Sequence, residues 1–287
     1  MRRVGICSDS TCCLPPEVLR QYGIRLVPIM LHHDGKSYRD GVDISAGEIY
    51  RIMRKRKDLP TTSTPSAGDF LEVYHQLNHE TEGVVCITLT SLQSKTFEAA
   101  MVAKGMAKES IPKATVEVID SRAVAGALGF VVLEAARAAE GGGDLQQVCD
   151  AARSMMKKVI LVAMVDTLYY LARTGRVGRA AAWAGSLLNL KPVLEHNAEA
   201  GETMPLARPR SKAKAIEVML QALADSVGEA RVHVNVHHAD ELEQGERLKE
   251  EIGRRFDCAE LYLTEFTPGM GVHAGPGIIG FSFYAEQ

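Results

Sequence analysis

The chain has 287 residues, of which 46% are hydrophobic and 24% are charged, a composition typical of a globular protein with a sizeable core. Its formal charge of −3 gives no general attraction to nucleic acid or to an anionic membrane, so we expect neither as a partner. No run approaches the roughly 18 apolar residues of a membrane-spanning helix, and the first residues lack the pattern of an export signal. We therefore expect a cytoplasmic protein of two domains without an integral membrane segment.

The first half of the chain alternates between short apolar runs and segments with helix signals. Capping boxes at Ser45–Glu48 and Ser66–Asp69 predict two helix starts, and Asp34-Gly35 predicts a hairpin turn. The predicted strands are 4–8, 24–31, 84–89 and 115–119, with a hairpin partner at 37–39. The predicted helices are 16–22, one opening at Ser45, 70–77, 96–108 and one ending near Glu140. This alternation indicates an N-terminal α/β domain with a mostly parallel sheet flanked by helices.

A glycine run at 141–143, followed by Asp144, is the strongest linker signal in the chain. We therefore predict an N-terminal domain over 1–142 and a C-terminal domain over 143–287. The predicted elements of the second domain are a helix to 158, a strand at 159–165, an interrupted helical stretch at 166–184, paired strands at 193–196 and 204–208, a helix at 212–226, a strand at 231–237, a helix at 241–256, a strand at 260–266, a glycine-rich loop at 268–277 and a strand at 278–284. The hairpin-like pairs indicate a C-terminal α/β domain with a mixed or antiparallel sheet.

Several short motifs resemble cofactor sites, but their context does not support that chemistry. Gly275–Gly280 fits the letters of the dinucleotide fingerprint but precedes a strand, whereas that fingerprint must open a helix, so we reject a nucleotide site. Cys12-Cys13 is interpreted as two free thiols, since no second cysteine pair accompanies it. His233, Asn235 and His237 share one face of a strand without a third ligand of the right kind, which favours a polar outer face over a metal site. We expect no metal and no other cofactor.

Two hydroxyl-rich loops, 61–66 and 90–94, each precede a predicted helix. Helix N-termini offer unpaired N–H groups and partial positive charge, so hydroxyls beside them favour an anion site. Plain helix capping is the alternative, and the sequence leaves both open. A third loop, 269–277, places His273 among four glycines, which let a backbone approach a ligand closely. Either a functional or a structural role for that histidine fits this pattern.

Together, these and other segments resemble the DegV family. Each segment is weak evidence alone, but their order and spacing along nearly the whole chain are specific as a set. The matching segments are 8–11 (SDST), 62–66 (TSTPS), 90–97, 119–121 (IDS), 165–168 (VDTL), 174–178 (TGRVG), 188–192 (LNLKP), 208–210 (RPR) and 273–277 (HAGPG).

The resemblance implies both a fold and a function. Proteins of this family bind a long-chain fatty acid in a tunnel between two α/β domains, and a separate ATP-binding fatty acid kinase subunit phosphorylates the bound carboxylate. By motif, Thr62 and Ser94 bind the carboxylate and His273 lies with them. Arg176 and Arg210 act near the head group or in coupling to the kinase. The resemblance therefore implies a lipid-binding carrier in phospholipid metabolism that is not an enzyme on its own.

Some positions depart from the family pattern. Thr64 stands where glutamine is usual, Gln93 stands where leucine is usual, and Thr174 replaces the first glycine of a GGRI motif. Lys95 follows the carboxylate-binding serine where glycine is usual. A lysine at that position could pair with the ligand, or it could narrow the approach of the backbone.

Two other functions stay open at this stage. One is a stand-alone hydrolase or phosphotransferase that uses Asp9, Ser10 and His273, although the sequence carries no nucleophile motif, metal set or nucleotide loop. The other is a carrier or sensor of a different amphipathic acid. The ligand extracted from the purified protein would distinguish these functions.

Overall fold

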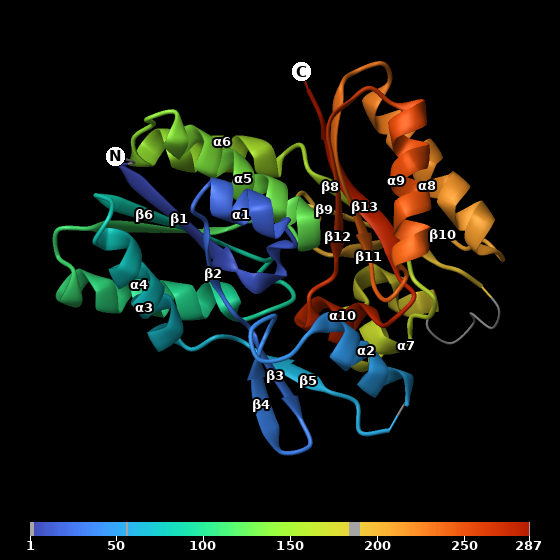
Figure 1. The fold of residues 1–287 in the computed structure, drawn as a ribbon, viewed down its shortest axis with the longest axis horizontal. Coiled ribbons are helices and arrows are strands. Elements are labelled where there is room, and N and C mark those ends of the chain that lie inside the picture. The colour runs from blue at the N-terminus through green and yellow to red at the C-terminus, as the bar shows by residue number, and fades with distance from the viewer. Residues whose placement is uncertain (1–2, 56, 184–189, 287) are drawn as a thin grey trace.

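The computed structural model describes residues 3–55, 57–183 and 190–286. Two sheets of different topology lie beside one another, and a small third sheet extends from the N-terminal part (Figure 1). The end of the helical stretch predicted at 166–184 and the first two residues of the 188–192 motif fall outside the described residues. Within the described ranges, no helix is both long enough and apolar enough to cross a membrane.

The N-terminal sheet has the strand order β2-β1-β6-β7 and is parallel throughout, as predicted. Its strands are β1 (Val4–Asp9), β2 (Arg25–Val27), β6 (Gly83–Thr88) and β7 (Thr115–Asp120). Figure 1 shows α3 (Ala67–Asn78) and α4 (Thr96–Ser110) on one face and α1 (Pro16–Gln21), α5 (Ala125–Glu140) and α6 (Leu145–Met156) on the other. Helices on both faces explain why β1 and β6 are buried along their whole length. The domain boundary at 142 stays a prediction.

The predicted strand at 24–31 is two strands in different sheets, which corrects the prediction. Pro28 has no N–H for a ladder, so the chain leaves the parallel sheet after β2 and enters the small sheet. That sheet has the order β4-β3-β5, with β3 (Met30–His33), β4 (Lys36–Arg39) and β5 (Thr61–Ser63), and α2 (Ala46–Arg54) follows β4. The predicted hairpin turn is confirmed: Asp34 and Gly35 have φ values of 50° and 69°.

The C-terminal sheet has the order β10-β9-β8-β13-β11-β12 and is mixed, as predicted. Only β11 and β12 pair in parallel within it. Its strands are β8 (Ile160–Met164), β9 (Val193–Asn197), β10 (Thr203–Ala207), β11 (Val232–His238), β12 (Cys258–Glu265) and β13 (Ile279–Ala285). The accompanying helices are α7 (Tyr169–Arg173), α8 (Lys212–Val227), α9 (Leu242–Arg255) and α10 (Pro268–Ala274), with short 3₁₀ turns at Ser10–Cys12 and Gly178–Trp183. Helices α8 and α9 cover one face of this sheet, and the other face turns toward α5 (Figure 1).

The polar face of β11 is buried against α5, so the prediction of a polar outer face is wrong. A Cβ on Gly126 of α5 would lie 2.4 Å from Nε2 of His237. Asn235 Nδ2 donates to the backbone oxygen of Cys13 at 2.9 Å, and His237 Nδ1 pairs with the Thr264 hydroxyl at 2.7 Å. Burial lowers the pKa of His237 to about 3, so this buried imidazole is neutral at pH 7.

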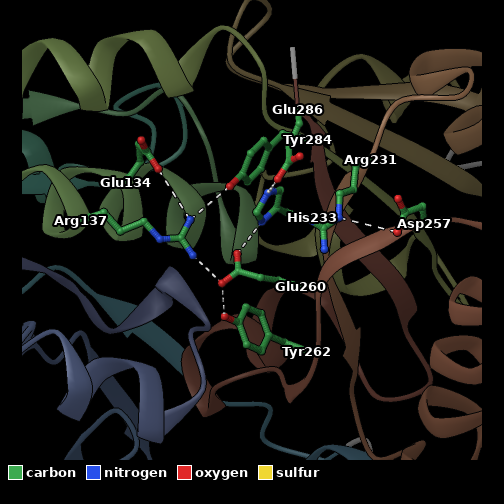
Figure 2. A network of polar contacts seen from close by, with 9 residues as sticks. All are labelled: Glu134, Arg137, Arg231, His233, Asp257, Glu260, Tyr262, Tyr284 and Glu286. Atoms are coloured by element: carbon green, nitrogen blue, oxygen red, sulfur yellow. Dashed lines mark hydrogen bonds and ion pairs between the residues drawn. The ribbon is translucent and has the colours of Figure 1, made fainter.

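A second polar network joins α5 to the C-terminal sheet (Figure 2). Arg137 of α5 forms an ion pair with Glu260 of β12. Glu260 also accepts from the Tyr262 hydroxyl at 2.6 Å and pairs with His233 Nδ1 at 2.5 Å. Burial alone would raise the pKa of Glu260, but these hydrogen bonds outweigh it and lower the pKa to about 2. Helix α5, which packs on the N-terminal sheet, is therefore linked to the C-terminal sheet by a charged cluster as well as by a shared apolar core.

Candidate functional site

A cavity of about 330 Å³ lies between the N-terminal part of the chain and the C-terminal sheet. Most of its wall is apolar and comes from both halves of the chain, including Ile29, Leu89, Val124, Leu161, Val165, Leu194, Phe266 and Ile278. Its volume falls at the lower end of the range for small-ligand sites, about 300–1,000 Å³. An apolar wall of this kind favours a ligand with a hydrocarbon part, since each buried CH₂ contributes about 0.8 kcal/mol.

Part of the cavity lining is polar. Four of the five predicted site residues line the cavity, and they come from four separate segments: Thr62, Ser94, Arg176 and His273. Ser63 and Lys95 line the cavity too and are exposed. The polar group therefore lies where the cavity reaches the surface.

Thr62 and His273 are in direct contact, with Thr62 Oγ1 2.8 Å from His273 Nε2. Burial, together with the nearby Arg176 and Arg173, lowers the pKa of His273 to about 4. The imidazole is therefore neutral at pH 7 and keeps one donor and one acceptor. Its Nδ1 is buried and has no hydrogen-bond partner among the described residues. His273 can thus hydrogen-bond a ligand and orient Thr62, but it brings no charge.

His273 lies on helix α10, so the prediction of a glycine-rich loop is wrong. Thr267 caps the start of this helix, Pro268 occupies its first turn, and Gly275 ends it with a φ of +82°. A capping threonine before proline and a terminal glycine are ordinary helix signals, and they could have revealed α10. Glycine is also required for packing at the end of α10, since a Cβ on Gly275 would lie 2.2 Å from the Tyr170 ring.

Ser94 lies at the start of α4, as predicted. Its Oγ accepts from the backbone N–H of Thr96 at 3.3 Å and pairs with the Thr96 hydroxyl at 2.8 Å. Lys95 occupies the N-cap position but makes no capping bond with its side chain. Its Nζ pairs with Glu98 at 2.9 Å, and 80% of the lysine side chain is exposed. The lysine is therefore directed along the surface of α4, and Ser94 is the hydroxyl that this helix start offers to the cavity.

The hydroxyl groups of the 61–66 segment have two different roles. Ser66 caps α3, where its Oγ accepts from the backbone N–H of Asp69 at 3.2 Å. Thr62 instead lies on β5, paired with Leu31 of β3. The prediction that Thr62 sits at a helix start is therefore wrong, and helix capping accounts for Ser66 alone.

The two predicted arginines lie in different environments. Arg176 is partly buried; its Nε donates to the backbone oxygen of Gln93 at 3.1 Å, and its Nη1 donates to that of Thr174. Since a guanidinium has five N–H donors, Arg176 can hold this backbone and still present positive charge to the cavity. Arg210 is exposed, follows β10 and does not line the cavity.

The residues of the alternative enzyme are not arranged for nucleophilic catalysis. Ser10 Oγ donates to buried Asp40 at 2.6 Å, and Asp9 accepts from backbone N–H groups. His273, the predicted base, pairs with Thr62 and not with Ser10, so the three residues named for the enzyme do not form a nucleophile–base pair. Asp40 also accepts from the backbone N–H of Gly269 at 2.8 Å. This network therefore anchors the first turn of α10, which carries His273.

Among the polar residues of the cavity wall that sequence reasoning missed are His196 and Thr203. They lie on the hairpin β9–β10, which loops of the N-terminal domain hold over the cavity. Thr90 Oγ1 donates to the backbone oxygen of Gly201 at 2.8 Å, and Arg122 donates to carbonyl oxygens of the same turn. These segments are distant in sequence, so no local pattern marks the two residues.

A family model and proteins of known sequence match nearly the whole length of this chain. The model of the DegV family, described as an uncharacterised protein family, matches residues 3–286. A DegV domain-containing protein of Clostridium acetobutylicum is 33% identical over 285 residues, covering 99% of this chain and 98% of that protein. Protein DegV of Bacillus subtilis is 29% identical over 279 residues, covering 96% and 97%.

Solved structures agree with these sequence matches. A fatty-acid-binding DegV family protein from Thermus thermophilus is 30% identical with a TM-score of 0.91, covering 99% of this chain and 100% of that one. DegV of Bacillus subtilis, a fatty acid binding protein, is 28% identical with a TM-score of 0.89 over the full length of both chains. A stearic acid-binding protein from Eubacterium ventriosum is 28% identical with a TM-score of 0.91, covering 99% and 98%. Since the family model and the relatives span nearly the whole chain, the protein belongs to the DegV family.

Proposed function

We propose that this chain binds a long-chain fatty acid in the cavity. The carboxylate lies at Thr62, Ser94 and His273 beside Arg176, and the hydrocarbon tail lies along the apolar wall. One observation carries the proposal: a single cavity has an apolar wall and a polar group where it reaches the surface. An ionised carboxylate that leaves water needs charge-assisted hydrogen bonds, and these side chains can supply them.

The solved relatives support this ligand class. The proteins from Thermus thermophilus and Bacillus subtilis bind fatty acids, and that from Eubacterium ventriosum binds stearic acid. The hydrogen bonds of Asp9 and Ser10 to neighbouring groups favour a binding protein over a hydrolase.

We further propose that the bound acid is phosphorylated by a separate ATP-binding fatty acid kinase subunit, as the family resemblance implies. The exposed position of Ser63 and Lys95 beside the polar group supports access by such a partner in the cytoplasm. Arg176 would stabilise the charge that develops on the transferred phosphoryl group, and exposed Arg210 would contact the partner. The chain itself would then be a carrier and not a catalyst.

Extraction of the purified protein tests the ligand. Mass spectrometry of the organic extract should yield long-chain fatty acids in near-stoichiometric amount, and the emptied protein should bind added fatty acid again. Protein that is consistently empty and does not bind added fatty acid would contradict the proposal. Recovery of a different amphipathic acid would support the alternative carrier function.

A further inference from the structure

Strand β9 contributes two polar residues, Glu195 and His196, to the lining of the cavity. His196 is 2% exposed, lines the cavity and lies on the same face of β9 as Leu194. Its Nε2 lies 3.1 Å from the backbone oxygen of Arg122. Since a carbonyl oxygen can only accept, Nε2 carries the imidazole proton.

The other ring nitrogen, Nδ1, is therefore an acceptor. Burial lowers the pKa of His196 to about 4, so the ring is neutral at pH 7 and Nδ1 bears no proton. Nδ1 is buried, and none of the residues that the structure describes is hydrogen-bonded to it. A buried acceptor without a donor is unfavourable, so this position favours a ligand that brings a donor of its own.

Thr203 supplies a hydroxyl next to this acceptor. It lies directly opposite His196 in the antiparallel pair β9–β10 and also lines the cavity. The Cβ atoms of such opposite residues are about 4.5–5.5 Å apart, so one ligand oxygen can contact both side chains. Gln93 Nε2 donates to Thr203 Oγ1 at 3.2 Å, which fixes the hydroxyl oxygen, and a hydroxyl that accepts one bond can still donate another.

We propose that His196 and Thr203 form a subsite for a hydroxyl group on the acyl chain, so that this protein prefers a monohydroxylated fatty acid to the unsubstituted acid. The ligand hydroxyl donates to His196 Nδ1 and accepts from Thr203 Oγ1. An unsubstituted chain places a CH₂ group against Nδ1 and leaves the acceptor unpaired. Sites built to hydrogen-bond a hydroxyl discriminate against analogues that lack it. The inference rests on the proposed function, because it assumes that the acyl chain occupies this cavity.

Calorimetric titration of the emptied protein tests the subsite. The ligands are stearic acid and a series of monohydroxystearic acids that differ only in the carbon that bears the hydroxyl. At least one isomer should bind roughly three- to tenfold more tightly than stearic acid, the factor expected for one net hydrogen bond. His196→Phe keeps a ring of similar size and should abolish this preference while stearic acid still binds. Thr203→Val keeps the β-branched shape and should reduce the preference, which gives a second test if the histidine variant does not fold.

Val193→Ala is the matched control, because Val193 is a buried apolar residue of the same strand that does not line the cavity, so the variant should leave the preference intact. The subsite is wrong if wild-type protein binds every isomer no more tightly than stearic acid. That result would mean that a water molecule, and not the ligand, donates a hydrogen bond to Nδ1. The subsite is also wrong if the preference persists in both His196→Phe and Thr203→Val. Failure of stearic acid and all isomers to bind would instead refute the proposed function, and the subsite with it.

Discussion

Replacing Thr62 by valine removes one hydroxyl from the polar part of the cavity and leaves the shape of the side chain nearly unchanged. Thr62 lies on β5, paired with Leu31 of β3, and its Oγ1 holds His273 Nε2 at 2.8 Å. Valine is β-branched like threonine and suits a strand, so β5 should persist. The variant therefore tests the hydrogen bond to the ligand with little disturbance of the fold.

The expected loss of affinity follows from the bonds that Thr62 makes. A hydrogen bond to a charged group is worth about 1.5–3 kcal/mol, which corresponds to roughly a 10- to 150-fold rise in Kd. Because the valine also leaves the partly buried Nε2 of His273 without its hydroxyl partner, we expect a value in the upper half of that range. Ser94→Ala should weaken binding in the same direction, since Ser94 lines the same part of the cavity.

The assay is a fatty-acid titration of the emptied protein, together with urea unfolding of each variant. Ser66→Ala is the matched control: its hydroxyl caps α3 and does not line the cavity, so it should cost about 1 kcal/mol of stability without changing Kd. Unchanged affinity in a Thr62→Val, Ser94→Ala double variant would refute the assignment of these hydroxyls as carboxylate ligands. Lower stability at unchanged affinity would assign Ser94 to helix capping.

Three further predictions follow from the same geometry. In an assay with the cognate kinase subunit, Mg²⁺ and ATP, Arg176→Ala and Arg210→Ala should each lower acyl phosphate formation about tenfold. The ligand content of each variant, measured by mass spectrometry, should fall much less. Equal losses in both measurements would mean that these residues only hold the ligand. Because the folded pKa of Glu260 lies below its ordinary value, at about 2, its contribution to stability is present above pH 4.5 and is lost as the pH falls through 2. In urea unfolding the difference between wild type and Glu260→Gln should therefore shrink over that interval, and a difference independent of pH would contradict this. Gly275→Ala should cost about 1–3 kcal/mol, since its Cβ would meet the Tyr170 ring at 2.2 Å and its φ is positive; a melting temperature equal to that of wild type would refute the steric argument.

Local sequence patterns predicted most of the elements because the physics of those elements is local. The capping boxes at Ser45 and Ser66 each close in the structure as predicted, since the two partners are three residues apart. The apolar runs of β1 and β6 predicted a buried parallel sheet for a similar reason, because a strand covered on both faces needs no polar alternation. Two predictions were wrong although the correct signals are local. The break at Pro28 was outweighed by the hydrophobic run at 24–31, and the helix signals of α10 were outweighed by its glycines.

Prediction of the site was less complete. Thr62, Ser94, Arg176 and His273 were found through the family resemblance, and the structure brings them to one cavity. The sequence could not show that Thr62 contacts His273 rather than a helix N-terminus, because 211 residues separate the two. Arg210 was predicted by the same route and lies outside the cavity, so its role depends on the proposed partner.

The sequence by itself determined the order and type of most elements, the parallel first sheet, the mixed second sheet and the absence of a nucleotide fingerprint in a suitable context. Only the tertiary structure decided which polar groups are buried together. His233, Asn235 and His237 were predicted to form an outer face, but all three are buried in the structure. His196 lies in the cavity wall because N-terminal loops hold the β9–β10 hairpin in place. Alternation along a strand specifies which residues share a face, whereas the packing of distant segments specifies what that face meets.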